Sequence, residues 1–330
     1  LTIRDMGRLD AALTSRVLRP TFLALLRGMR AVAFDTYHYG SLPLLRWVGR
    51  KGLDVRKLDA TFCEVKDGDT ALIWACKENE VDLVVLLCQG SDINTPTHGM
   101  ASKTNLLGAS PIHFACNSRN LAIAKLLLSV PKLNVESKDA LGRSALHLAI
   151  EPATALPAST EENACEIVKL LLARSAALVT AVDNAGTTPL MAACRVGQLD
   201  LVQLLLEGNA NPCDMTDKKG KTCMFFACSN GHTPVVRALV DRFGEALAAL
   251  ENRGVSGSSS GDGKTCLHVA CSTGHSELVG ILLNELNVHF LPDSKGRNPL
   301  HVACEQGFID IAHLLLTKHP EEIDSVDKDR

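Results

Sequence analysis

Residues 186–212 read GTTPLMAACRVGQLDLVQLLLEGNANP, and this stretch decides the fold. It holds two apolar segments, 189–194 and 199–206, on either side of a glycine. In the second segment Leu and Val recur at three- and four-residue spacing, which is typical of an amphipathic helix. Before the first segment, Thr188 can cap free backbone N–H groups, and Pro189 suits the first helical position. The stretch therefore predicts two helices joined by a tight turn.

The same pattern recurs along most of the chain, with seven copies in all. A Leu-rich second segment follows each copy, and loops such as DNAGTTP, DKKGKTC and DSKGRNP precede several of them. We expect the Asp that begins these loops to hold them by side chain to backbone hydrogen bonds. The first segments are DTALIWAC (69–76), ASPIHFAC (109–116), RSALHLAI (143–150), TTPLMAAC (187–194), KTCMFFAC (221–228), KTCLHVAC (264–271) and RNPLHVAC (297–304).

These copies resemble the ankyrin repeat, whose pattern is G-x-T-P-L-H-x-A-A-x-x-G-H followed by a Leu-rich helix. GRNPLHVACEQG and the opening stretch match it almost in full, and the resemblance covers about residues 61–323. It implies an all-α ankyrin-repeat solenoid of stacked helix-turn-helix units with finger loops. In such a solenoid a concave surface is formed by the fingers and the first helices.

The spacing of the copies predicts the domain organisation. Residues 1–60 are expected to form N-terminal capping helices and a divergent first repeat, and residues 61–330 the repeats. Three intervals exceed the usual period of about 33 residues, which places insertions near 95–108, 151–162 and 251–262. The final residues EEIDSVDKDR resemble the approach to another finger. Whether further repeats or a catalytic domain precede or follow the chain stays open.

The segment CLHVACSTGH (266–275) contains two cysteines and two histidines, so we considered a metal site. Each of the four residues occupies a repeat position. Cys266 and His268 would also point about 200° apart on a helix, too far to share one small ion. We expect neither a metal nor a cofactor. The resemblance instead implies a structural hydrogen-bonding role for His113, His147, His268 and His301.

The recurrent cysteines allow a disulfide ladder or an array of reactive thiols. Equivalent positions in adjacent repeats lie about 8–10 Å apart, whereas bridged Cα atoms lie within about 7 Å. A ladder of equivalent positions is therefore excluded. The preferred interpretation is that small buried residues fill one repeat slot, namely Cys76, Cys116, Cys194, Cys228, Cys271 and Cys304.

Composition narrows the function. The 330 residues carry a net charge of −3, which argues against nucleic acid as a partner. No apolar run is long enough to enter a membrane, and no common catalytic motif occurs. We therefore expect a non-enzymatic, monomeric protein. The twelve cysteines suit a reducing compartment, so a cytoplasmic or nuclear location is expected.

A partner is expected on finger residues and on the two positions before the turn between helices. These positions are markedly basic, which favours an acidic or phosphorylated segment of another protein; solvated charges are the equally weighted alternative. The candidate residues are Lys138, Arg143, Asn184, Thr187, Arg195, Lys218, Lys219, Lys221, Asn230, Lys264, Thr273, Lys295, Arg297 and Gln306.

The sequence thus predicts a non-catalytic protein–protein interaction scaffold. The alternative is a substrate-recruiting or regulatory module of an enzyme or ubiquitin-ligase adaptor whose catalytic part lies outside this chain. Neither the partner's identity nor its pathway can be derived from the sequence.

Overall fold

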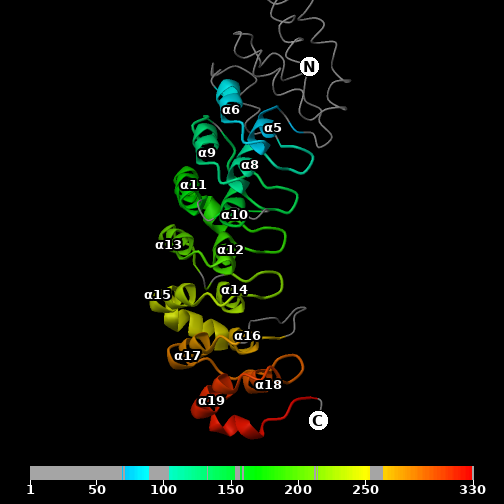
Figure 1. Ribbon diagram of the computed structural model, residues 1–330, viewed down its shortest axis with the longest axis vertical. Helices are drawn as coiled ribbons and strands as arrows, with labels where there is room; N and C mark the ends of the chain where they lie inside the picture. Colours follow the sequence, from blue (N-terminus) through cyan, green and yellow to red (C-terminus); the bar gives the residue numbers. More distant parts are fainter. Residues whose placement is uncertain are drawn as a thin grey trace, which may run out of the picture. The chain divides into compact units, whose positions relative to one another are not determined.

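The computed structural model describes residues 69, 71–88, 104–131, 133–152, 157, 160–211, 213, 215–252 and 263–328 (Figure 1). These residues form helices and connecting loops without an extended strand, which confirms the expected all-α class. The chain forms two compact units, Leu1–Asp139 and Ala140–Arg330. The capping helices expected in residues 1–60 lie outside the described residues.

In the N-terminal unit, α5 (Ala71–Lys77) packs against α6 (Val81–Cys88) and α8 (Pro111–Asn117). Both α6 and α8 pack against α9 (Leu121–Leu128). The two helix pairs therefore stack on each other, as the repeat pattern predicts.

The described residues of the C-terminal unit form five helix pairs in the same arrangement. The first helices, called inner helices below, are α10 (Ala145–Ile150), α12 (Pro189–Val196), α14 (Cys223–Ser229), α16 (Cys266–Thr273) and α18 (Pro299–Glu305). The second, or outer, helices are α11 (Glu161–Arg174), α13 (Leu199–Glu207), α15 (Thr233–Asn252), α17 (Ser276–Asn284) and α19 (Ile309–Lys318). Two short 3-10 helices, η2 (Ala176–Thr180) and η3 (Pro320–Asp324), follow α11 and α19.

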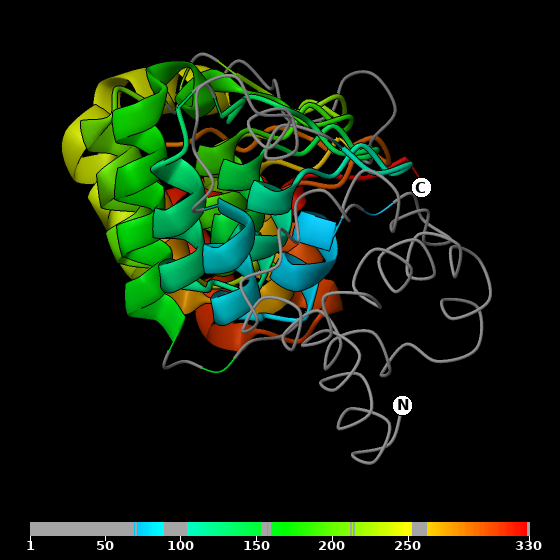
Figure 2. The ribbon, with the colours of Figure 1, turned by 90° about the horizontal axis from the view of Figure 1, so that it is seen from above.

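Each inner helix of this unit packs on the next inner helix, and each outer helix on the next outer helix. Seen from above, the outer helices lie on one side and the loops that precede the inner helices gather on the other (Figure 2). Each of these loops is called a finger. Their common direction creates one face built from fingers and inner helices.

Local sequence explains where an inner helix begins and ends. Thr188 accepts a hydrogen bond from the N–H of Met191, and Pro189 occupies the first turn of α12. At the other end Gly197 has φ +84°, a left-handed conformation that glycine adopts without a steric penalty. Gly274 ends α16 in the same way. The predicted cap and turn are therefore confirmed in both repeats, and the predicted proline in α12.

The turn glycines are also needed for stacking. A Cβ atom on Gly197 would meet the ring of His232 at 2.3 Å, and one on Gly231 would meet His275 at 2.4 Å. The His232 ring also spans two repeats, with Nε2 3.0 Å from the carbonyl of Arg195. The Gly-His pair therefore joins neighbouring repeats.

Three fingers of the C-terminal unit are held by an aspartate, as the sequence predicts. The Oδ1 atom of Asp217 accepts hydrogen bonds from the N–H groups of Lys219 at 2.9 Å and Lys221 at 2.7 Å. Asp183 and Asp293 bond in the same way to the residues two and four positions later. Successive fingers also bond to each other, as from Lys218 N to Ala185 O and from Lys328 N to Lys295 O.

The cysteine prediction holds for five of the six residues. Cys76, Cys116, Cys194, Cys228 and Cys271 are buried. The prediction is wrong for Cys304, which is exposed on α18. In this slot Cys194 and Cys228 contact Cys223 and Cys266 of the next inner helix, whereas the described residues contain no inner helix after α18.

Cysteines at different positions of neighbouring repeats do contact each other. Because only equivalent positions were compared in the sequence, these contacts were not predicted. A hydrogen bond with Cys194 and burial raise the pKa of Cys223 well above its ordinary value. Burial and a hydrogen bond with Cys228 do the same for Cys266. All four residues are free thiols, and the raised pKa keeps Cys223 and Cys266 protonated and unreactive.

The edges of the three expected insertions are ordered. In the N-terminal unit, Asn105 replaces the finger aspartate and accepts hydrogen bonds from the N–H groups of Leu107 and Ala109. Residues 161–162 belong to α11, and residues 251–252 end α15, which is kinked at Phe243. The buried Glu251 there accepts a hydrogen bond from the Thr222 hydroxyl at 3.0 Å, so the end of α15 packs on α14.

Candidate functional site

The residue immediately before the N-cap occupies the same place in every repeat of the C-terminal unit. It is Arg143, Thr187, Lys221, Lys264 or Arg297, in chain order. The four cations among them are called the basic row below. All four are partly exposed.

The basic-row side chains lie along the inner helices. The Lys221 Nζ atom lies 4.5 Å from the centre of the Phe225 ring, a cation–π distance. Arg297 reaches Glu305, with 2.7 Å between Nη1 and Oε2. The charge of Lys264 acts on His268, one of several influences on a ring whose pKa is lowered chiefly by burial. The row therefore presents its charges on the face built from fingers and inner helices.

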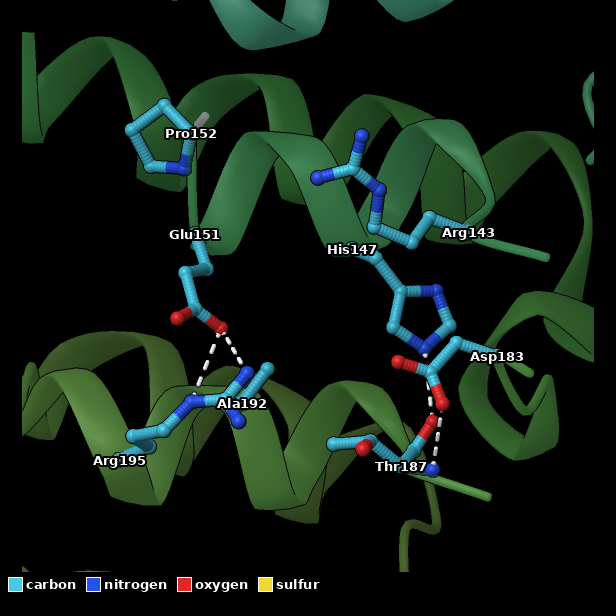
Figure 3. A pocket seen from close by; sticks show the side chains of 8 residues that line it. All are labelled: Arg143, His147, Glu151, Pro152, Asp183, Thr187, Ala192 and Arg195. Atoms are coloured by element: carbon cyan, nitrogen blue, oxygen red, sulfur yellow. Dashed lines mark hydrogen bonds and ion pairs between the residues drawn. The ribbon is translucent and has the colours of Figure 1, made fainter. Parts of the chain in front are cut away.

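A polar pocket of about 260 Å³ lies on this face between α10 and α12 (Figure 3). At one end Glu151 forms an ion pair with Arg195, and Pro152 lies beside them. At the other end the Nε2 atom of His147 lies 3.0 Å from the carbonyl of Thr187. The full lining is Arg143, His147, Glu151, Pro152, Asp183, Thr187, Ala192 and Arg195. The pocket is smaller than most small-molecule sites, which span about 300–1,000 Å³, and suits a single side chain.

Arg195 is fixed by more than one contact. Its guanidinium also lies 5.5 Å from the centre of the Phe226 ring. Its carbonyl oxygen is 3.0 Å from both Asn230 Nδ2 and His232 Nε2. Glu151 therefore offsets the charge of Arg195 and also holds it in place.

Several predicted partner-binding residues have structural contacts. Thr187 is only 3% exposed, and its N–H donates to Asp183. Asn184 is exposed at a fingertip but donates to the carbonyl of Ala140. Thr273 is exposed and donates to the carbonyl of Val269. Together with Asn230, these residues connect repeats or cap helices.

The charged candidates differ in how they are held. Lys218, Lys219 and Lys295 are exposed on fingertips. Arg297 is bound by Asp293 as well as by Glu305, so two carboxylates offset its charge. In the N-terminal unit Lys138 is exposed, and Gln306 is exposed after α18. The structure thus brings Arg143, Thr187 and Arg195 together at the pocket, and it places Lys218, Lys219 and Lys221 on one finger.

The histidines of the repeat motif perform the predicted structural role. The backbone N–H of Thr265 can only donate, so His268 Nδ1 accepts from it at 3.2 Å. His268 Nε2 then carries the proton and donates to the carbonyl of Arg297 at 2.8 Å. Both ring nitrogens are therefore occupied. Within the described part of the chain, no three His, Cys, Asp or Glu side chains are grouped to hold a metal ion.

Sequence reasoning missed four residues of this face, namely Glu151, Phe225, Phe226 and Glu305. Phe225 fills the slot of the motif histidine, and Phe226 follows it. Glu151 and Glu305 occupy the same repeat position as Arg195, so listing acids as well as bases at that position would have found them.

Comparison with known proteins agrees with this geometry. A family model described as ankyrin repeats, in three copies, matches residues 155–248 and 245–329. A single ankyrin-repeat model matches residues 67–98 and 107–139. No curated protein matches the chain significantly. In the described ranges, no helix has both the length and the apolar character needed to cross a bilayer.

Proposed function

We propose, from the premise that the chain belongs to the ankyrin-repeat family, that it binds an acidic or phosphorylated segment of another protein. Ankyrin repeats generally mediate protein–protein interaction and are typically non-catalytic. The proposed binding surface is the face built from fingers and inner helices in the C-terminal unit, and the proposed location is cytoplasmic or nuclear.

The observation that carries this proposal is the charge of the finger at residues 217–221. It contains one carboxylate, Asp217, and three lysines. One oxygen of that carboxylate is bound by two backbone N–H groups, whereas Lys218 and Lys219 are exposed. The finger therefore presents net positive charge to an approaching anion.

The surrounding surface supports the same choice of partner. Lys221 is held against the Phe225 ring, which reduces the side-chain entropy lost when it binds an anion. The pocket between α10 and α12 is lined by two cations, Arg143 and Arg195, and by two carboxylates, Glu151 and Asp183, so its charges balance. An anionic side chain would therefore gain charge-assisted hydrogen bonds mainly at the finger of residues 217–221.

The test uses a fluorescein-labelled polyglutamate peptide and its phosphoserine counterpart. We expect the triple variant K218E/K219E/K221E to lose most binding at low salt, because each reversed charge repels the probe. The matched control, K169E/R174E/K318E, changes the same net charge on the outer helices α11 and α19 and should retain more binding. Circular dichroism checks that both variants fold. Undiminished binding by the finger variant would overturn the proposal.

A further inference from the structure

The pocket between α10 and α12 lies where one repeat position holds an unusually small residue. Ala192 lines the pocket, and it is the sixth residue of the segment TTPLMAAC (187–194). A larger residue fills this place in each of the other copies, namely Trp74, Phe114, Leu148, Phe226, Val269 and Val302. Because α12 forms this wall, a larger side chain at residue 192 would take up part of the pocket. The pocket is therefore particular to this repeat.

Three charged side chains of the lining have hydrogen-bonding atoms to spare. Both Nε and Nη2 of Arg195 donate to Oε2 of Glu151. Among the described residues nothing bonds to Oε1 of that glutamate or to Nη1 of Arg195. Across the pocket (Figure 3), Oδ1 of Asp183 accepts from the N–H groups of Ala185 and Thr187, whereas Oδ2 accepts from no described residue. The pocket thus offers two acceptor oxygens and one donor nitrogen.

The charge of the lining selects a neutral ligand. It holds two cations and two carboxylates, so a charged ligand is repelled by two groups whichever sign it carries. Such a ligand also loses hydration when it enters. An apolar side chain would displace water from the polar lining without replacing its hydrogen bonds. A neutral side chain with both a donor and an acceptor avoids all of these costs.

We propose that this pocket binds the carboxamide side chain of a glutamine or asparagine of a partner protein. Its NH2 group donates to Oδ2 of Asp183 or Oε1 of Glu151, and its oxygen accepts from Nη1 of Arg195. These hydrogen bonds involve charged groups and are stronger than neutral ones. The ion pair with Glu151 and the Phe226 ring already hold Arg195 in place, which reduces the entropy lost on binding. The inference goes beyond the proposed function, because it concerns a neutral side chain away from the finger at residues 217–221.

The test compares five acetylated and amidated pentapeptides, GGQGG, GGNGG, GGEGG, GGKGG and GGMGG. Their backbones and ends are identical, so differences in affinity come from the central side chain. Binding is followed by NMR through the Nε–H signal of Arg195, which is identified by its loss in Arg195→Lys. We expect the Gln or the Asn peptide to bind about fivefold or more tightly than the Glu, Lys and Met peptides, because only a carboxamide satisfies both kinds of polar group. Equal affinity of all five, or binding of none, would overturn the proposal.

Variants that fill the pocket connect this preference to its place. Ala192→Leu and Ala192→Val introduce residues that occupy the same repeat position at Leu148 and Val269, and circular dichroism checks that both fold. Each should remove the preference for a carboxamide, and a preference that persists in both would overturn the proposal. The matched control is Ala173→Leu, at an exposed position of α11, which should keep it.

A further variant separates this inference from the proposed function. K218E/K219E/K221E should bind the carboxamide peptide as the wild-type protein does, even where it has lost polyglutamate binding. Loss of the carboxamide preference in this variant would show that the finger, and not the pocket, recognises the peptide, which would overturn the inference. Failure of polyglutamate to bind the wild-type protein would remove the proposed function and leave this inference standing.

Discussion

Two fingers of the C-terminal unit have similar sequences but hold their basic residues differently. Residues 217–222 read DKKGKT and residues 293–298 read DSKGRN. Lys221 lies over the Phe225 ring, whereas Arg297 is bound by Asp293 and Glu305. The repeat position therefore fixes where a basic residue lies, and its neighbours determine how much charge it offers a partner.

The largest expected effect comes from removing the aspartate of each finger. Asp293 is fully buried as a side chain and accepts hydrogen bonds from two backbone N–H groups and from the Arg297 guanidinium. Asp293→Ala should lower the free energy of unfolding by up to about 3–5 kcal/mol, the range for breaking a buried pair, because it removes the carboxylate that two backbone N–H groups and Arg297 share, while Arg297 keeps Glu305. Asp217→Ala removes two backbone hydrogen bonds and should cost about 1–3 kcal/mol.

Urea unfolding followed by circular dichroism measures both values. Equal losses in the two variants would contradict the difference drawn between the fingers. Asp293→Asn is a useful control because it keeps the volume and one acceptor oxygen, and its loss should be smaller than that of Asp293→Ala.

The same contrast predicts a pH dependence, which should be smaller than the effect of Asp293→Ala. Burial tends to raise the pKa of Asp293, but hydrogen bonds from the backbone and guanidinium of Arg297 and from the backbone of Lys295 outweigh it and hold the pKa below its usual value. This carboxylate therefore stabilises the folded state above its unfolded pKa of about 3.9, and the stabilisation is lost as pH falls through the lower folded pKa.

Urea midpoints measured from about pH 7 to about pH 3 test this. The wild-type protein should lose more stability over that range than Asp293→Asn, which has no carboxylate to titrate at this position. Parallel curves for the two proteins would show that Asp293 does not contribute to acid unfolding.

Most of the fold could be predicted because its determinants are local and recur. Thr188 caps α12 and Pro189 occupies its first turn, and Asp183 forms its hydrogen bonds within four residues. The insertion expected near 251–262 overlaps the end of α15, which continues to Asn252. The segment GEALAALEN (244–252) is rich in strong helix formers, so the signal was present.

The site was less predictable because it depends on contacts between repeats. Thr187 holds a finger position, yet it is buried and its carbonyl lies 3.0 Å from His147 of the preceding repeat. Cys304 holds a buried slot, yet it is exposed where no further inner helix covers it. Position within one repeat cannot reveal either outcome, since burial here is a property of the neighbouring repeat.

The smallest expected effect on stability comes from removing Glu305, the exposed carboxylate that pairs with Arg297 of the finger at residues 293–298. Without it, Arg297 is less neutralised and more like Lys221 of the finger at residues 217–222. Arg297 Nη1 donates to Glu305 Oε2 at 2.7 Å, and the Glu305 side chain is 55% exposed. Such surface pairs contribute little, so Glu305→Gln should change the free energy of unfolding by no more than about 0.5 kcal/mol. It removes one negative charge beside the basic row, so binding of the labelled polyglutamate peptide should strengthen about two- to threefold at low salt and lose that gain at high salt.

The matched control for this change is Glu277→Gln on α17, since Glu277 pairs with Arg237 and is 66% exposed. Fluorescence anisotropy of the labelled peptide compares the two variants. Each variant removes one negative charge. An equal gain in peptide affinity would therefore mean that the overall charge of the protein governs binding and that the carboxylates around Arg297 have no special effect. A gain confined to Glu305→Gln would show that the neighbours of a basic-row residue control the charge it presents.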